Sequence, residues 1–114
     1  MLVVSDTSPL NYLILIKCQE VLPAIFGKIL IPSQVIEELQ RLKAPIAVRN
    51  WANSLPDWVQ VLPGDSARFP ALNDGEAAAL ALALDFGAGL LVDDADARLV
   101  AAEAGVVAVG TVVF

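Results

Sequence analysis

The sequence predicts an α/β fold built on a parallel sheet, with helices on both faces. Short runs of Leu, Ile and Val without polar alternation, at residues 2–5, 29–31 and 90–92, are typical of strands that are buried on both faces. Between these runs lie segments with the composition of helices, bounded by turn residues. This alternation of strand and helix predicts a layered α/β/α sandwich.

The chain begins with a strand at residues 2–5, which is followed by a helix over residues 10–16. Thr7 or Ser8 can cap the N-terminus of this helix, and the proline after them suits its first turn. A second helix is expected over residues 19–26, ending at a glycine, although its internal proline removes a hydrogen bond.

The middle of the chain continues the same alternation. Residues 29–31 form a short apolar strand, and a helix capped by the serine that follows is expected over residues 33–42. Residues 46–54 have the pattern of an amphipathic helix. Residues 58–62 alternate between apolar and polar side chains, which indicates a strand at the edge of the sheet.

After a loop rich in proline, glycine and polar residues, a long apolar helix is expected over residues 73–86. It opens with an asparagine that is followed three residues later by a glutamate, which is the pattern of a capping box, and a glycine stops it. Residues 90–92 form a strand, residues 95–104 a helix that ends at a glycine, and residues 106–109 a last strand.

Acidic side chains follow two of the predicted strands. Asp6 comes directly after the first strand, and Asp93 and Asp94 follow the strand at residues 90–92. In open α/β sheets, ligands bind beyond the carboxyl ends of the strands. Because clustered like charges repel one another, a shared acidic pocket at this edge indicates a divalent cation.

Helical geometry selects two glutamates as further candidates. Glu38 borders the apolar arc of its helix, whereas Glu37 points to the solvent side. Glu76 lies one turn before Leu80 on a helix that is apolar nearly all round. A carboxylate on such a buried face needs a partner or a metal.

Each acid also has a purely structural interpretation. Asp6 can cap the first helix, Glu76 can be only the capping-box partner of Asn73, and Asp93 or Asp94 can cap the last helix. The functional interpretation is favoured because four separate segments place acids at the predicted edge of the sheet or beside it.

Composition is compatible with a phosphate substrate. The 114 residues predict one domain, and their net charge is −6, from 13 acids and seven bases. With five acids assigned to the pocket, eight remain against seven bases, and a bound metal would reverse the local sign. The absence of histidine excludes histidine-based acid–base catalysis and leaves carboxylate–metal chemistry.

The sequence contains no convincing membrane span, since a span needs about 20 apolar residues with few charges. No basic region precedes the first apolar run, so we expect no signal peptide. The single cysteine cannot form an internal disulfide, and a cytoplasmic location is the simplest expectation.

Four segments resemble the motifs of PIN-domain nucleases, in order and in spacing. They are residues 3–10 (VVSDTSPL), 31–39 (IPSQVIEEL), 72–77 (LNDGEA) and 91–94 (LVDD). Residues 95–98 and 109–111 are similar to the branch of the family that includes VapC-like toxins. The resemblance covers essentially the whole chain and implies a PIN-like domain over residues 1–114.

The resemblance implies hydrolysis of RNA phosphodiesters by an endoribonuclease that depends on Mg²⁺ or Mn²⁺. It places Asp6, Glu38, Glu76, Asp93 and Asp94 at the catalytic positions. Asp6 and Asp93 are expected to bind the metal directly, and Glu76 through water. Glu38 and Asp94 are expected to bind it through water or to position the nucleophile, with Thr7 or Ser8 contacting the substrate. VapC-like relatives are homodimers that an antitoxin protein holds inactive.

One departure from the family is expected to matter. Relatives continue for some tens of residues after the segment at 109–111, whereas this chain stops at Phe114. We therefore expect it to lack the C-terminal helix and strand of its relatives. Two alternatives to the nuclease follow: a catalytically impaired PIN-like module for binding or dimerisation, and a receiver-like phosphoacceptor domain, because residues 90–94 also resemble the first strand of a receiver.

Overall fold

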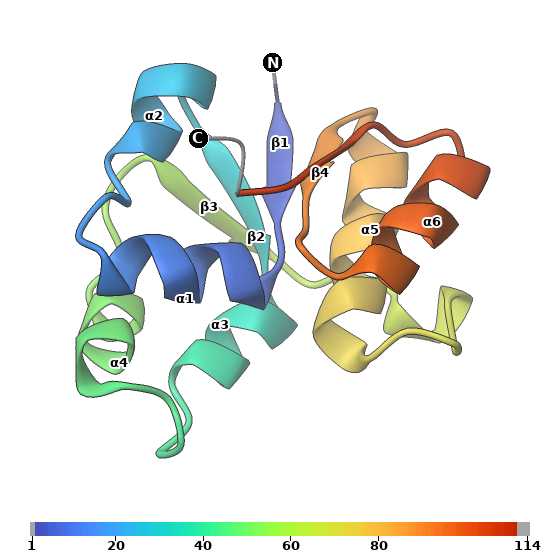
Figure 1. The fold of residues 1–114 in the computed structure, drawn as a ribbon. Helices are drawn as coiled ribbons and strands as arrows, with labels where there is room; N and C mark the ends of the chain where they lie inside the picture. The colour runs from blue at the N-terminus through green and yellow to red at the C-terminus, as the bar shows by residue number, and fades with distance from the viewer. Residues whose placement is uncertain (1, 112–114) are drawn as a thin grey trace.

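A parallel sheet lies at the centre of the molecule (Figure 1). The computed structural model describes residues 2–111. Within them, parallel strands lie in the order β3-β2-β1-β4-β5. Their bounds are β1 (Val3–Ser5), β2 (Ile29–Pro32), β3 (Val59–Leu62), β4 (Gly89–Leu91) and β5 (Ala108–Val109). Because the winding changes direction between β1 and β4, the carboxyl ends of these two strands flank the point at which open α/β sheets bind ligands.

Helices cover both faces of the sheet (Figure 1), which confirms the predicted α/β/α sandwich. One layer contains α1 (Thr7–Leu15), α2 (Val21–Phe26), α3 (Ser33–Leu39) and α4 (Ile46–Asn53). The other contains α5 (Asp74–Phe86) and α6 (Ala95–Glu103), with the short 3-10 helix η1 (Ser66–Arg68) against α5.

Neighbouring residues of each central strand pack into opposite layers. Val3 belongs to the core beneath α1–α4, and Val4 to the core beneath α5 and α6. Ile29 and Leu30 divide in the same way, and all four side chains are buried. Strands buried on both faces are therefore apolar at every position, which is the pattern from which the sequence predicts them.

The ends of α5 follow from local side-chain chemistry, as the sequence predicts. The Glu76 amide donates to Asn73 Oδ1 at 2.9 Å, and the Asn73 amide donates to Glu76 Oε1 at 3.4 Å, which completes the capping box. The helix ends at Gly87, whose φ of 60° suits a residue without Cβ. Pro23 is accommodated in α2 because it lies in the first turn, where its missing N–H has no acceptor within the helix.

Helix α3 is shorter than the sequence predicts. It ends at Leu39 instead of residue 42, and its N-cap is Pro32 instead of Ser33. Leu42, the last residue of the predicted helix, is 88% exposed in the turns that follow. Residues 40–44 instead form the turns that connect α3 to α4, which begins after Pro45.

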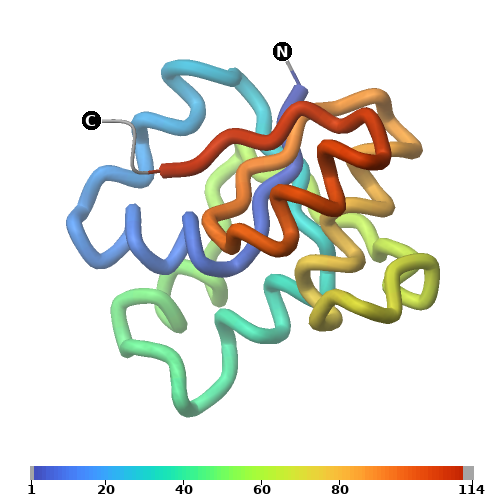
Figure 2. The backbone as a smooth tube through the Cα atoms, turned by 45° about the vertical axis from the view of Figure 1, so that its right-hand side comes forward, coloured from blue at the N-terminus to red at the C-terminus, as the bar shows by residue number. Residues whose placement is uncertain are grey.

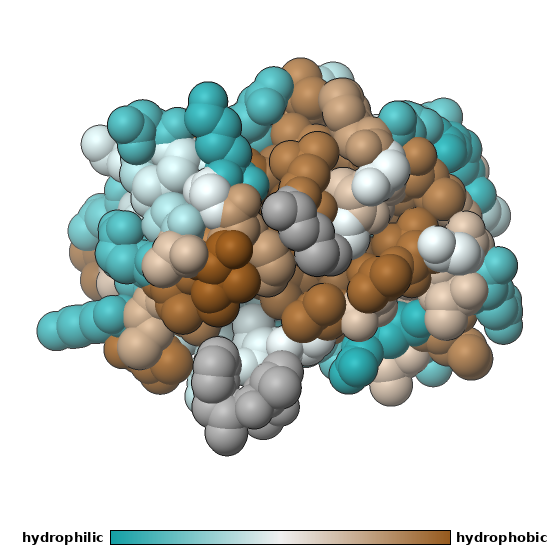
Figure 3. Space-filling model, turned by 90° about the horizontal axis from the view of Figure 1, so that it is seen from above, coloured by the Kyte–Doolittle hydropathy of each residue, from teal (hydrophilic) through white to brown (hydrophobic). Residues whose placement is uncertain are grey.

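The end of the molecule at the amino termini of the strands is rich in apolar side chains. Figure 3 shows this face, and a hollow of about 480 Å³ there is lined by residues that include Leu2, Leu84 and Val107.

After β5 the chain crosses toward α2 (Figure 2), where Thr111 lines a cavity together with Val21. No helix within residues 2–111 combines the length and apolar content that crossing a membrane requires.

Candidate active site

The segments that carry the predicted acids converge at the carboxyl edge of the sheet. Asp6 follows β1 and is the N-cap residue of α1, Glu38 lies on α3, and Glu76 lies in the first turn of α5. Asp93 and Asp94 follow β4. These segments surround the switch point between β1 and β4, so the topology alone brings carboxylates from distant parts of the sequence to one place.

Asp6 is the most deeply buried acid of this group. It is 4% exposed, its amide donates to the Leu91 carbonyl at 3.0 Å, and its side chain makes no capping hydrogen bond to α1. The pKa of the Asp6 carboxyl is raised to about 7, mainly by burial and also by the charges of Glu76, Glu38 and Asp94, against the opposing effect of the Thr7 amide. Helix capping therefore does not explain why this carboxylate is where it is.

Glu38 is held by a side chain from another element. The Thr7 hydroxyl donates to Glu38 Oε2 at 2.7 Å, which joins the start of α1 to α3. Glu38 is partly buried and Glu37 is exposed, as the helical geometry predicts. Thr7 and Ser8 are the residues expected to contact the substrate. Of the two, Thr7 is hydrogen-bonded to the acidic group, whereas Ser8 is exposed on α1.

Gly75 leaves a small cradle between these groups. A Cβ added at Gly75 would lie 3.1 Å from Glu38 Oε2, 3.4 Å from Asp6 Oδ1 and 3.4 Å from Thr7 Oγ1. Three oxygens, two from the start of α1 and one from α3, therefore border the space that the missing side chain leaves open. Sequence reasoning placed Gly75 in a motif but gave it no role, because nothing local marks the helix position that faces the other segments.

Glu76 is both the capping-box partner of Asn73 and a neighbour of the other acids. Its backbone and side chain complete the capping box with Asn73. Partial burial raises the pKa of its carboxyl, and the charges of Asp94, Glu38 and Asp96 add to the rise, while the Asn73 amide opposes it. The capping interpretation is therefore correct without removing Glu76 from the acidic group.

The two adjacent aspartates after β4 have different surroundings. The Thr111 hydroxyl lies 2.8 Å and 2.7 Å from the two carboxylate oxygens of Asp93, and the Thr111 amide donates to Asp93 Oδ1 at 2.8 Å. Asp94 accepts from the Ala97 amide at 2.9 Å as the N-cap of α6, and its charge acts on both Asp6 and Glu76. The charge of Asp94 therefore acts on the group around Asp6, whereas the carboxylate of Asp93 is bound by Thr111.

The donor set suits a hard divalent cation. All of the charged ligands are carboxylates, the cradle at Gly75 is bordered by oxygens, and the buried Asp6 would gain a counter-charge. Within residues 2–111, no three acidic or sulfur side chains are already arranged as a finished metal site. The residues therefore fit such an ion by their chemistry and position, and binding would require their side chains to adjust.

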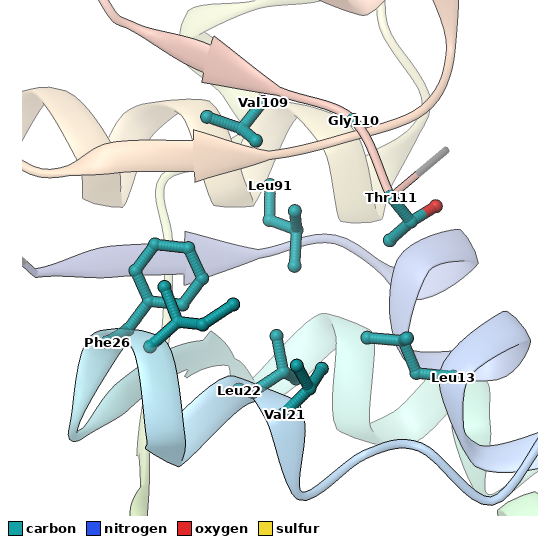
Figure 4. A pocket seen from close by; sticks show the side chains of 9 residues that line it. Leu13, Val21, Leu22, Phe26, Leu91, Val109, Gly110 and Thr111 are labelled. Carbon is teal, nitrogen blue, oxygen red and sulfur yellow. The ribbon is translucent and has the colours of Figure 1, made fainter. Parts of the chain in front are cut away.

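A separate cavity of about 280 Å³ has a different character. Leu13, Leu22, Phe26 and Leu91 point into the space between α1, α2 and β4 (Figure 4), and most of the side chains that line it are aliphatic or aromatic. It has no charged side chain in its lining, so it offers nothing to a phosphate or a metal ion.

Comparison with known proteins identifies relatives. Residues 2–114 match the family model described as DUF3368, a PIN domain. The fold is similar to the solved structure of a PilT N-terminus domain protein from the hyperthermophilic archaeon Sulfolobus solfataricus P2, with a TM-score of 0.62 and 18% sequence identity over 97% of this chain and 87% of that chain. No curated protein matches the sequence.

Proposed function

The chain belongs to the PIN-domain family, and from that premise we propose that it is a metal-dependent endoribonuclease, the toxin of a toxin–antitoxin pair. PIN domains are nucleases that typically use divalent metal ions. The observation that carries the proposal is Asp6, a carboxyl that is 4% exposed, with its pKa raised to about 7, beside a cradle bordered by Glu38. A buried carboxylate among other acids lowers the stability of the fold unless a bound cation supplies a counter-charge, so such a group indicates a functional site.

We expect Asp6, Glu38, Glu76 and Asp94 to hold Mg²⁺ or Mn²⁺. Bound there, such an ion supplies a more acidic water and neutralises charge at the scissile phosphate. The expectation that Asp93 is a direct ligand remains a prediction. Its contacts with Thr111 favour Asp94 in its place.

The remaining residues orient and tune this group. Thr7 keeps Glu38 turned toward the cradle through its 2.7 Å hydrogen bond. Asp6 must give up its proton before it can act as a ligand, so its raised pKa makes metal affinity depend on pH near neutrality.

An antitoxin and a second copy of the chain are the proposed protein partners. Large apolar side chains are exposed, with Leu42 at 88%, Ile46 at 67% and Val107 at 64%, and such residues favour association. Co-purification with the product of an adjacent gene would test the first partner, and light scattering the second. A monomer at all concentrations would rule out the dimer.

Calorimetric titration with Mn²⁺, paired with cleavage of a fluorogenic single-stranded RNA, tests the proposed reaction. Glu38→Gln removes a charge from the cradle, and Glu37→Gln removes the same charge from the exposed neighbour as the matched control. We expect the wild type and Glu37→Gln to bind Mn²⁺ and cleave RNA, and Glu38→Gln to lose about 100-fold in activity. A folded wild type that neither binds Mn²⁺ nor cleaves RNA would overturn the proposal. Binding without cleavage would favour the impaired module.

A further inference from the structure

Two adjoining hollows lie beside the acidic group, and together they form a groove. The larger has a volume of about 300 Å³ and is lined by residues that include Thr7, Asn11, Glu38, Arg41 and Lys43. The smaller, about 130 Å³, is lined by residues that include Glu38, Arg41 and Gly75. Because Glu38 and Arg41 border both, the groove runs from the cradle at Gly75 to the turns after α3.

The cations of this groove are available to a ligand. Arg41 and Lys43 are exposed, and the only ion pair within residues 2–111 joins Arg68 to Asp85. Although Glu38 lies three residues before Arg41, its Oε2 atom accepts the Thr7 hydroxyl. Two unpaired cations thus line the same hollow as Glu38 on a chain whose net charge is −6.

An acidic protein that handles a polyanion needs local cations where the strand lies. Contacts between cationic side chains and phosphates supply most of the affinity for a nucleic-acid backbone. A hollow of about 300 Å³ is the size of a small-molecule site. Its size is on the scale of about one nucleotide of a single strand.

We propose that this groove binds the sugar–phosphate backbone of single-stranded RNA beside the bond to be cut, with Arg41 and Lys43 contacting successive phosphates. The inference rests on the proposed ribonuclease function and adds the path of the substrate. Arg41 lines both hollows and is placed nearer the acidic group, and Lys43 extends the path away from it. Both act on binding and not on the reacting atoms.

The test measures RNA affinity where no turnover occurs. Each variant is made in an Asp6→Asn background, and the dissociation constant of a fluorescein-labelled single-stranded RNA is measured by anisotropy over a range of KCl concentrations. The groove pair is Arg41→Gln with Lys43→Gln. The control pair is Lys17→Gln with Lys28→Gln, two exposed cations outside the groove lining, so that both pairs change net charge equally.

We expect the groove pair to weaken binding about tenfold and to reduce the slope of log K against log [KCl] by about 1.4, since each phosphate contact on a single strand contributes about 0.7. The control pair should leave the slope unchanged. Equal effects of the two pairs, or no RNA binding by the Asp6→Asn protein, would overturn the groove proposal. RNA cleavage by the wild type, assayed in parallel, distinguishes the two proposals. If the wild type cleaves RNA, only the groove proposal is rejected. If it does not cleave RNA, the proposed ribonuclease function is rejected as well.

Discussion

The carboxylate of Asp93 is bound by Thr111, which lies 18 residues further along the chain, beyond β5. The Thr111 amide and hydroxyl lie 2.8 Å from Asp93 Oδ1, and the hydroxyl lies 2.7 Å from Oδ2. Arg98 Nη1 and Asp93 Oδ1 both lie close to Gly110, at 3.4 Å and 3.5 Å from the position a Cβ would take there. This contact ties the end of β4 to the end of β5 and leaves the next residue, Asp94, to act on Asp6.

The two aspartates should therefore differ in what their substitution costs. Hydrogen bonds to charged groups contribute about 1.5–3 kcal/mol. We expect Asp93→Ala to lower the free energy of unfolding by about 2 kcal/mol, with Mn²⁺ affinity little changed. Asp94→Asn, which can still cap α6, should weaken Mn²⁺ binding with little loss of stability. Urea unfolding and Mn²⁺ calorimetry check both. Loss of Mn²⁺ binding in Asp93→Ala at unchanged stability would instead support Asp93 as the ligand.

Asp6 should make the metal-free protein less stable as pH rises. Its folded-state pKa of about 7 lies above its ordinary value of 3.8, so the folded state binds more protons between these values. The stabilisation from this group is complete below pH 4 and is lost as pH rises through 7. The difference between the two pKa values corresponds to a free energy of about 4 kcal/mol. The amide of Asn at this position would still carry part of the cost of burying a polar group. We therefore expect Asp6→Asn to be more stable than the wild type by about 2 kcal/mol at pH 8.

Urea unfolding in EDTA at pH 4.5 and pH 8 measures this difference. We expect the gain from Asp6→Asn to be small at pH 4.5 and large at pH 8. If the stability of the wild type relative to Asp6→Asn stays the same over this interval, Asp6 has an ordinary pKa in the folded protein. Saturating Mn²⁺ should reverse the order at pH 8, because only the wild type gains from the ion.

The parts of the fold that depend on local chemistry were predictable. Asn73, Glu76 and Gly87 specify where α5 begins and ends through contacts within a few residues of each end. The strands were predictable because burial on both faces requires an apolar side chain at each position. The end of α3 was not: residues 40–42 have the composition of a helix, and they form turns in the connection to α4.

The sequence predicts which segments converge at the site, but it does not predict which atoms lie next to one another there. Topology brings Asp6, Glu38 and Glu76 to one edge, and helical geometry distinguishes Glu38 from Glu37. The choice between Asp93 and Asp94 depends on Thr111, whose position follows from the pairing of β5 with β4. Periodicity within one element contains no information about such a contact.

Glu76 allows its two roles to be separated. Glu76→Gln keeps a side chain that can complete the capping box but removes the charge, so it should lower Mn²⁺ affinity at nearly unchanged stability. Asn73→Ala removes the cap and keeps the charge, and should cost about 1 kcal/mol of stability with little change in Mn²⁺ affinity. The same calorimetric and urea experiments compare the two. If Glu76→Gln binds Mn²⁺ as the wild type does, Glu76 is a capping residue only.

Gly75 provides the sharpest test of where the ion is held. Gly75→Ala would place a methyl group 3.1 Å from Glu38 Oε2 and 3.4 Å from Asp6 Oδ1, inside the cradle. The position lies in the first turn of α5 and its φ is outside the left-handed region, so alanine is compatible with the helical backbone, and the variant should fold if the Glu38 carboxylate shifts away from the 3.1 Å contact. Mn²⁺ affinity should fall about tenfold, because the carboxylates can no longer close on a shared ion.

Asp74→Asn is the matched control for this substitution, since it changes the same helical turn without putting an atom beside Asp6 and should leave Mn²⁺ affinity almost unchanged. Thermal unfolding in EDTA shows whether each variant is folded. A folded Gly75→Ala protein with wild-type Mn²⁺ affinity would mean that the ion binds away from the cradle. The acids would then hold the ion on the side of Asp94 and Glu76, because the charge of Asp94 has the largest charge effect on the Glu76 carboxyl.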